Sequence, residues 1–366
     1  MGCSACLVCF CWRLPNSVMS SRRPFPNRVL IAVGIVAVSI LTMYLFVVLS
    51  RVLLVVFAGV LVAVGLGGGA DILRRRTPLA RPGALAVVIT AVVLVPFLFS
   101  GIAGPPLTGQ INDLVVQLPA AAEAFRDRLA EQPWIQRLLG EPSTLRELMP
   151  SPKEVMGGVT SAFSRTLGVV ANVFVILFIG IYGAAAPGSY VSGVVHLTPN
   201  RHRARAREVI DALAHALRWW LVGRLTMMSV VGVLTTVGLW VAGIPTALAL
   251  GLLAALLSFV PYVGPLLSFV PALLVALTMS STKVVYVMIV FGVVQTLESY
   301  VVTPLVQQRA VSMPPVILIT AQIAMGVLAG ATGVLLAAPL AVVVIVLLQM
   351  LYVEDVLGDS VRVLGQ

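Results

Sequence analysis

The sequence predicts an all-α polytopic membrane protein with about six full transmembrane helices and two re-entrant hairpins broken by Gly and Pro. Hydrophobic residues make up 59% of the 366 residues and charged residues 10%, which excludes a soluble globular domain. The mean hydropathy is +1.05. Two apolar segments, 246–280 and 315–350, each hold about 35 uncharged residues, whereas about 20 helical residues cross a bilayer.

Residues 1–28 are basic and interrupted by prolines, so we expect a disordered cytoplasmic tail that is not a signal peptide. All four cysteines lie in its first eleven residues, so no disulfide framework links distant parts of the chain. The cluster could bind a metal, and Met1-Gly2-Cys3 is weakly similar to a lipidation signal. The alternative is that translation starts at Met19 and that residues 1–18 have no role.

Residues 29–104 are expected to form three transmembrane helices. From Val29 to Ala70 the run is long enough for two spans, which we expect to turn near Ser50-Arg51 as an antiparallel pair. The uncharged run Ala84–Gly104 then predicts the third span. Residues 105–155 contain seven acids against five bases and are expected to form an extracytoplasmic insertion with short amphipathic helices at Ala120–Glu131 and Pro133–Gly140.

Basic loops set the expected orientation of the chain. Residues 156–186 predict the fourth span, and residues 187–218 form an arginine-rich segment that the positive-inside rule places in the cytoplasm. Within it, Val209, Ile210, Leu213 and Leu217 share one face, which is typical of a helix on a membrane surface with anionic lipid as partner. The arginines after Asp71 and the tail at 352–366 are also expected inside. The protein is therefore placed in the bacterial inner membrane with cytoplasmic termini.

Residues 219–351 form the expected transport core, which contains both long apolar segments. The first is interrupted at Pro261-Tyr262-Val263-Gly264-Pro265 and the second at Gly330-Ala331-Thr332-Gly333, so a helical hydrogen-bond ladder should break near the middle of each. We expect two half-helices folded into a hairpin in each segment. Paired interruptions of this kind indicate a transport site. Two ordinary pairs of short spans are the alternative.

Glu298 is the one acid between Asp211 and Glu354, and it lies in an apolar helix between the two broken segments, with Gln295 on the same face. An ionisable group inside a span costs a few kcal/mol unless it is paired or solvated, so it marks an ion, proton or substrate pathway. A structural ion pair with Arg309 is the alternative.

The chain carries no motif of an enzyme or of a bound cofactor. Neither lysine, Lys153 nor Lys283, follows a glycine, so no phosphate-binding loop is present, and neither an HExxH motif nor a nucleophile elbow occurs. The three histidines fall in the cytoplasmic loop, where a solvated role is expected. The net charge of +10 is not accompanied by a basic face with interleaved aromatics, so nucleic acid is not an expected partner.

These residues make the chain from Val29 onward resemble the autoinducer-2 exporter family of bacterial permeases. The similarity is most specific in Val260–Pro265, in Gln295–Tyr300 with Pro304, and in Gly330–Gly333 through Pro339. Met313 stands where the family often has histidine, and Ser299 where asparagine is usual. The resemblance implies six to eight membrane segments, homo-oligomers, and transport of small molecules or ions without ATP.

We therefore expect a secondary transporter that exports a small polar metabolite or signal, with or without coupling to protons. A cation/proton antiporter and a non-transporting membrane scaffold are the alternatives. The predicted pathway residues are Glu298, Gln295, Pro261, Tyr262, Gly264, Pro265, Pro304, Gly330, Gly333 and Pro339. The expected partners are a small-molecule or ion substrate and membrane lipid.

Overall fold

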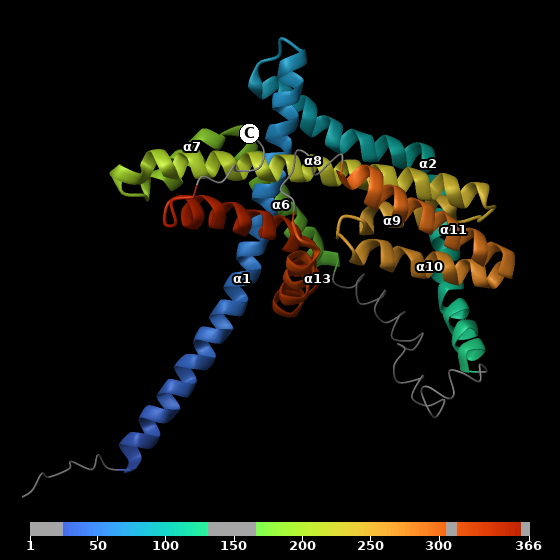
Figure 1. Ribbon diagram of the computed structural model, residues 1–366, viewed down its shortest axis with the longest axis horizontal. Coiled ribbons are helices and arrows are strands. Elements are labelled where there is room, and N and C mark those ends of the chain that lie inside the picture. Colours follow the sequence, from blue (N-terminus) through green and yellow to red (C-terminus); the bar gives the residue numbers. More distant parts are fainter. Residues whose placement is uncertain (1–24, 131–165, 305–312, 360–366) are drawn as a thin grey trace, which may run out of the picture. The chain divides into compact units, whose positions relative to one another are not determined.

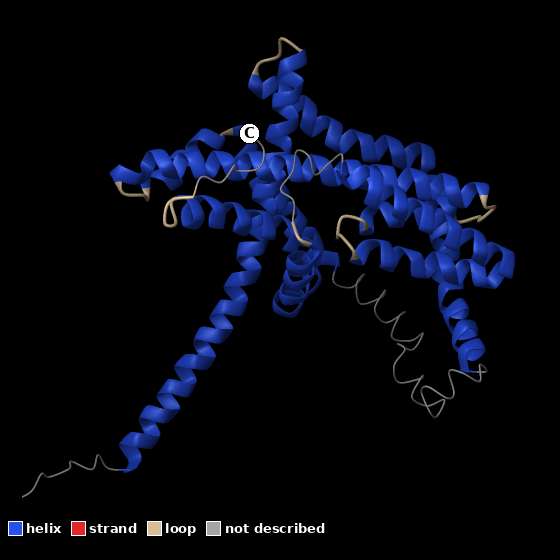
Figure 2. Cartoon of the chain, viewed as in Figure 1, coloured by secondary structure: helices blue, strands red, loops and turns tan. Residues whose placement is uncertain are grey.

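The computed structural model describes residues 25–130, 166–304 and 313–359. Residues 1–49 and 50–366 form two separate compact units, and the described part of the first is the start of helix α1. Helices make up most of the described residues, and no strand occurs among them (Figures 1 and 2). The helices are α1 (Phe25–Arg76), α2 (Arg81–Ala130), α6 (Thr166–Ala185), α7 (Pro187–His196), η1 (Asn200–His202), α8 (Arg203–Val241), α9 (Ala247–Leu257), α10 (Val263–Met279), α11 (Ser281–Leu297), η2 (Glu298–Val302), α13 (Pro315–Leu347) and η3 (Leu348–Glu354).

The predicted fold class, an all-α polytopic membrane protein, is confirmed. Among the described residues, five helices are long and apolar enough to cross a membrane. The number rises to six if α6 and α7, which meet at an angle of 89°, are counted as one bent span. Pro187 opens α7, and a proline at the first helical position cannot continue the hydrogen bonding of the preceding helix, which accounts for the bend.

The antiparallel pair expected between Val29 and Ala70 is wrong in the structure. α1 is a single helix of 52 residues that continues through Ser50-Arg51. A charged residue alone does not end a helix, and neither position is Gly or Pro, the residues that usually stop one. Residues 29–104 therefore contribute two helices, α1 and α2, instead of three.

The predicted third span is present, but it does not end near Gly104. α2 is 50 residues long and continues to Ala130, although four prolines lie inside it. Leu107, Leu114 and Leu118 on its second half pack with Leu239 and Leu250, so the first part of the expected insertion belongs to the folded core. The separate helix expected at 120–131 is the end of α2, and the helix expected at 133–140 lies outside the described residues.

The surface helix expected at 203–218 is the first half of α8, which continues without a break to Val241. Its apolar face is covered by protein: Val209 and Leu217 are buried in a cluster with Leu54, Leu61 and Val342. The helical period of the apolar residues was therefore informative, but it identified a packing face on the protein instead of a face for lipid.

The first broken segment forms two short helices, α9 of 11 residues and α10 of 17, joined by residues 258–262. Pro261 and Tyr262 of the predicted interruption lie in this break, while Val263, Gly264 and Pro265 begin α10. Both are shorter than the roughly 20 residues of a full span, and they pack against each other. Gly264 lies where they meet, because a Cβ built on it would be 2.0 Å from the Leu257 carbonyl oxygen. A larger residue therefore cannot occupy this turn without moving the backbone.

The second broken segment bends at the predicted position. Gly330 lies inside α13 with φ 63° and ψ −145°, a conformation that L-residues with a side chain rarely adopt. A Cβ on Gly333 would be 2.0 Å from the Met325 carbonyl oxygen, although eight residues of straight helix would separate the two positions by about 12 Å. The two halves of α13 therefore fold back on one another.

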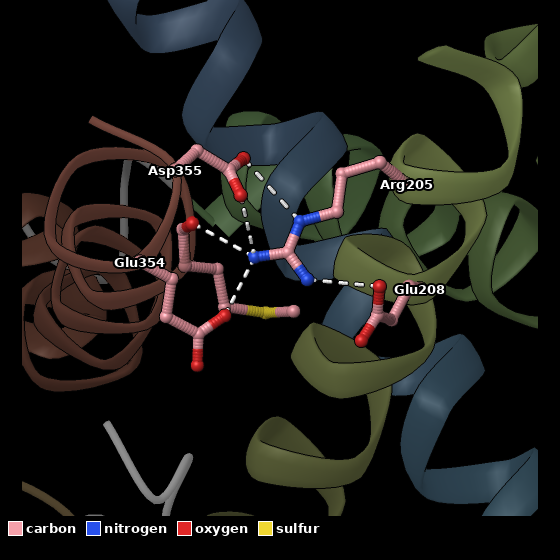
Figure 3. Close-up of polar contacts among 5 residues, drawn as sticks. Arg205, Glu208, Glu354 and Asp355 are labelled. Carbon is pink, nitrogen blue, oxygen red and sulfur yellow. Dashed lines mark hydrogen bonds and ion pairs between the residues drawn. The ribbon is translucent and has the colours of Figure 1, made fainter. Parts of the chain in front are cut away.

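Ion pairs join the first half of α8 to the end of η3 and to the end of α1. Arg205 contacts Glu208 at 2.8 Å, Glu354 at 2.6 Å and Asp355 at 3.0 Å (Figure 3). Further along α8, Arg218 contacts Asp71 near the end of α1 at 3.3 Å. The end of η3 and the end of α1 therefore both contact the arginine-rich half of α8, at positions about 20 Å apart along it.

Candidate functional site

A cavity of about 270 Å³ lies between α8, the turn from α9 to α10, α11 with η2, and the start of α13. It brings together five of the predicted pathway residues: Pro261, Tyr262, Pro265, Gln295 and Glu298. The other lining residues are Trp220, Gly223, Arg224, Met227, Ser299, Thr303, Met313 and Leu318. A cavity of this volume fits a small solute.

Arg224 is the cation of this cavity. It is 9% exposed, and its Nε donates a hydrogen bond to the Phe259 carbonyl oxygen at 2.9 Å. Trp220, one turn earlier on α8, stacks edge-on against the Phe259 ring with centroids 5.8 Å apart, which holds this part of the turn against α8. The Nη2 atom of Arg224 is buried and has no hydrogen-bond partner. A guanidinium with an unused buried donor is costly.

Glu298 lies across the same cavity, at the junction of α11 and η2. The helix changes there from α to π geometry over Glu298–Val302. π-helical turns are frequent at functional sites because the extra residue per turn redirects side chains. Gln295 is positioned on the preceding turn and donates to the Ser299 hydroxyl at 3.3 Å. No ion pair joins Glu298 to Arg224, although each charge influences the other electrostatically.

The two charges lie at a similar depth in the helices that carry them. Lys283 near the start of α11 donates from Nζ to the carbonyl oxygen of Ala242, just after α8, so the end of α8 meets the start of α11. Arg224 is 18 residues before Ala242 and Glu298 is 15 residues after Lys283, which corresponds to about 27 and 22 Å of helix. The cavity therefore lies far from this contact, toward the face that carries the ion pairs of Arg205 and Arg218.

The turn between α9 and α10 is held in a strained conformation beside the cavity. Tyr262 has φ 64°, the one positive value at a residue other than glycine in the described ranges. Such a conformation costs of the order of 1–3 kcal/mol and persists where surrounding contacts enforce it. Gln322 in the first half of α13 is one such contact, since its Nε2 donates to the Pro261 carbonyl oxygen at 3.0 Å. The two broken segments therefore meet at this turn.

Five predicted pathway residues do not line the cavity: Gly264, Pro304, Gly330, Gly333 and Pro339. Gly264 and Gly333 are buried at close backbone approaches, and Gly330 forms the bend of α13. Pro339 is buried within the second half of α13, and Pro304 follows the π-helical turn. The glycines therefore shape the two hairpins, and the part of these five residues in a substrate or ion pathway stays a prediction.

Sequence reasoning missed Arg224. It is the one charged residue between Arg218 and Lys283, so the same isolation that drew attention to Glu298 could have identified it. Its position near the arginine-rich loop made it look like part of the cytoplasmic boundary. Arg309, the partner considered for Glu298, lies outside the described residues.

Comparison with known proteins places the chain among transporters. The sequence model of the AI-2E transporter family matches residues 33–352. YueF and YrrI of Bacillus subtilis, both named as candidate transport proteins, are 27% and 29% identical to the chain. The alignments cover 72% and 66% of the chain, and 75% and 70% of those proteins. The AI-2 transport protein TqsA of Escherichia coli is 22% identical over 80% of the chain and 82% of its own length.

Proposed function

Because the chain belongs to the AI-2E transporter family, we propose that it is a secondary transporter that exports a small polar metabolite or signal molecule through the Arg224–Glu298 cavity, with a proton on Glu298 as the coupling ion. It is a multi-pass membrane protein of a transporter family, and the proposal concerns its substrate class, direction and coupling.

The observation that carries this proposal is the pair of opposite charges that face one small cavity without forming an ion pair. Two charges within a membrane-embedded bundle are costly unless something binds between them or water reaches them. A polar solute with its own donor and acceptor groups would satisfy both. A carboxylate in such a place can also gain and lose a proton as the solute binds and leaves, which is what coupling requires.

The two alternatives fit the cavity less well. A cation/proton antiporter would bind its cation at Glu298, but Arg224 lines the same small cavity and repels a second positive charge. A non-transporting scaffold would gain nothing from an unpaired buried guanidinium, because replacing buried charges with apolar groups is usually neutral or stabilising.

Transport can be tested in proteoliposomes loaded with a cytosolic extract of small polar metabolites. Acidifying the outside should raise the efflux of at least one compound, measured by mass spectrometry. Glu298→Gln keeps the size of the side chain and removes its charge, so it should lower the gradient-driven component at least about 10-fold. Glu123→Gln, an exposed acid on α2, is the matched control and should behave as wild type. Efflux that is the same in liposomes without protein would contradict the proposed function.

The orientation we propose has the face defined by Asp71, Arg205 and Glu354 in the cytoplasm, because arginines are concentrated there. In a cysteine-free background, a single Cys at Leu197, which is 87% exposed, should react with a membrane-impermeant maleimide only after permeabilisation. A Cys at Gln132 should react in intact cells. The reverse pattern would invert the orientation.

Because α1 is one continuous helix whose last turn carries Arg74, Arg75 and Arg76, we propose that the N-terminal tail lies on the opposite side, in place of the cytoplasmic position expected from its charge. Its four natural cysteines report its position directly in the otherwise cysteine-free chain. We expect them to react with the same reagent in intact cells. Protection until the cells are permeabilised would mean that α1 does not cross the membrane as a single helix.

A further inference from the structure

Arg224 has a binding capacity that the protein itself leaves unused. A guanidinium carries five N–H donors in a planar fork that matches the two oxygens of a carboxylate. Nε is occupied by the Phe259 carbonyl oxygen, while Nη2 is buried without a partner and the residue is 9% exposed. The nearest acid of the cavity, Glu298, does not form an ion pair with it. Since no described residue accepts a hydrogen bond from Nη2, this donor is available to an acceptor on a bound solute.

The rest of the cavity restricts what that acceptor can be. One cation and one acid line it, so the cavity matches a zwitterion when Glu298 is a carboxylate and a monoanion when Glu298 is protonated. A dianion such as phosphate is matched in neither state. Glu298, as a carboxylate, accepts hydrogen bonds only, so it requires a donor on the solute. Gln295, Ser299 and Thr303 add neutral polar groups on the Glu298 side. A volume of about 270 Å³ limits the solute to a few heavy atoms beyond its charged group.

We propose that the cavity binds a small monocarboxylate that also carries a hydroxyl or ammonium group, with its carboxylate on the free Arg224 donor and its hydroxyl or ammonium group on Glu298. This assignment rests on the proposed function for its physiological meaning, but it concerns binding, which can be measured without any gradient.

The test uses purified full-length protein in detergent with L-lactate, L-alanine and 1,2-propanediol as probes. The diol has the size and hydroxyl of lactate without the carboxylate, so it controls for shape. At least one of the two carboxylates should raise the thermal midpoint in a saturable way, and the diol should not. The proposal is overturned without any variant if the diol stabilises the protein as much as the carboxylates do. It is also overturned if neither carboxylate raises the thermal midpoint at concentrations that leave the protein otherwise unperturbed.

Variants locate the site. Arg224→Gln should weaken binding of the carboxylate about 10- to 100-fold, because a charge-assisted hydrogen bond is lost. Arg224→Lys should retain part of it, and Arg207→Gln, an exposed arginine on the same helix, should retain all of it. Glu298→Gln separates the two solute classes, since an ammonium group loses a charge partner and a hydroxyl group does not. Wild-type binding by Arg224→Gln overturns the proposal.

Binding and transport fail independently. Carboxylate binding that depends on Arg224, in a protein that exports nothing from proteoliposomes, would retain this site and refute the proposed function. Gradient-driven export that is unchanged in Arg224→Gln would retain the function and refute this site.

Discussion

Replacing Gly264 or Gly333 with alanine is expected to destabilise the protein strongly and to abolish transport. A single Cβ at either position would lie 2.0 Å from a backbone carbonyl oxygen, that of Leu257 or Met325, and backbone cannot rotate away as a side chain can. The cost of such overpacking is about 3 kcal/mol or more. In a detergent melting experiment this corresponds to a fall in the midpoint of at least about 6 °C.

Gly292→Ala is the matched control for both variants. Gly292 lies in α11, and a Cβ there would meet nothing within 4 Å. Alanine is about 1 kcal/mol better than glycine inside a helix, so this variant should melt at or slightly above the wild-type midpoint. If all three variants melted together and transported normally, the hairpin turns would not need their glycines.

A double replacement, Arg224→Gln with Glu298→Gln, is expected to transport no better than either single variant. Removing one partner of a buried ion pair costs about 3–5 kcal/mol because the other charge is left unpaired, and removing both recovers much of it. Arg224 and Glu298 face the same cavity and influence each other electrostatically without forming such a pair, so the double variant should recover less stability than the loss of both partners of a buried ion pair would. Both charges are needed for a bound solute, so transport should stay at background in all three variants.

This double-mutant cycle needs four proteins: the wild type, the two single variants and the double variant. Each is measured in one melting experiment and one efflux experiment. Recovery of transport in the double variant would show that Arg224 and Glu298 form a structural charge pair, and the coupling role of Glu298 would be wrong. Recovery of the melting midpoint without transport would show a structural interaction that the cavity geometry does not contain.

Local sequence was informative wherever the cause of structure is local. Gly330 adopts a positive φ, which a residue without a side chain adopts readily, and α9 is separated from α10 over residues 258–262, where the predicted interruption begins at Pro261. The ends of α1, α2 and α8 were predicted less well. A change from apolar to charged residues marks where a helix leaves one environment, but a helix continues until a residue or contact stops it. Thus α8 runs from the arginine-rich loop to Val241 without interruption.

The sequence by itself determined the membrane class, the two broken segments and Glu298 as the isolated acid, because these depend on the length of apolar runs and on residues that interrupt a helix. Tertiary structure decided what Glu298 faces. Arg224 is 74 residues away along the chain, and it shares a cavity with Glu298 only because α8 and α11 pack side by side with the Tyr262 turn between them. Which faces of two helices meet depends on the packing of all their neighbours, and no local pattern in either helix contains that information.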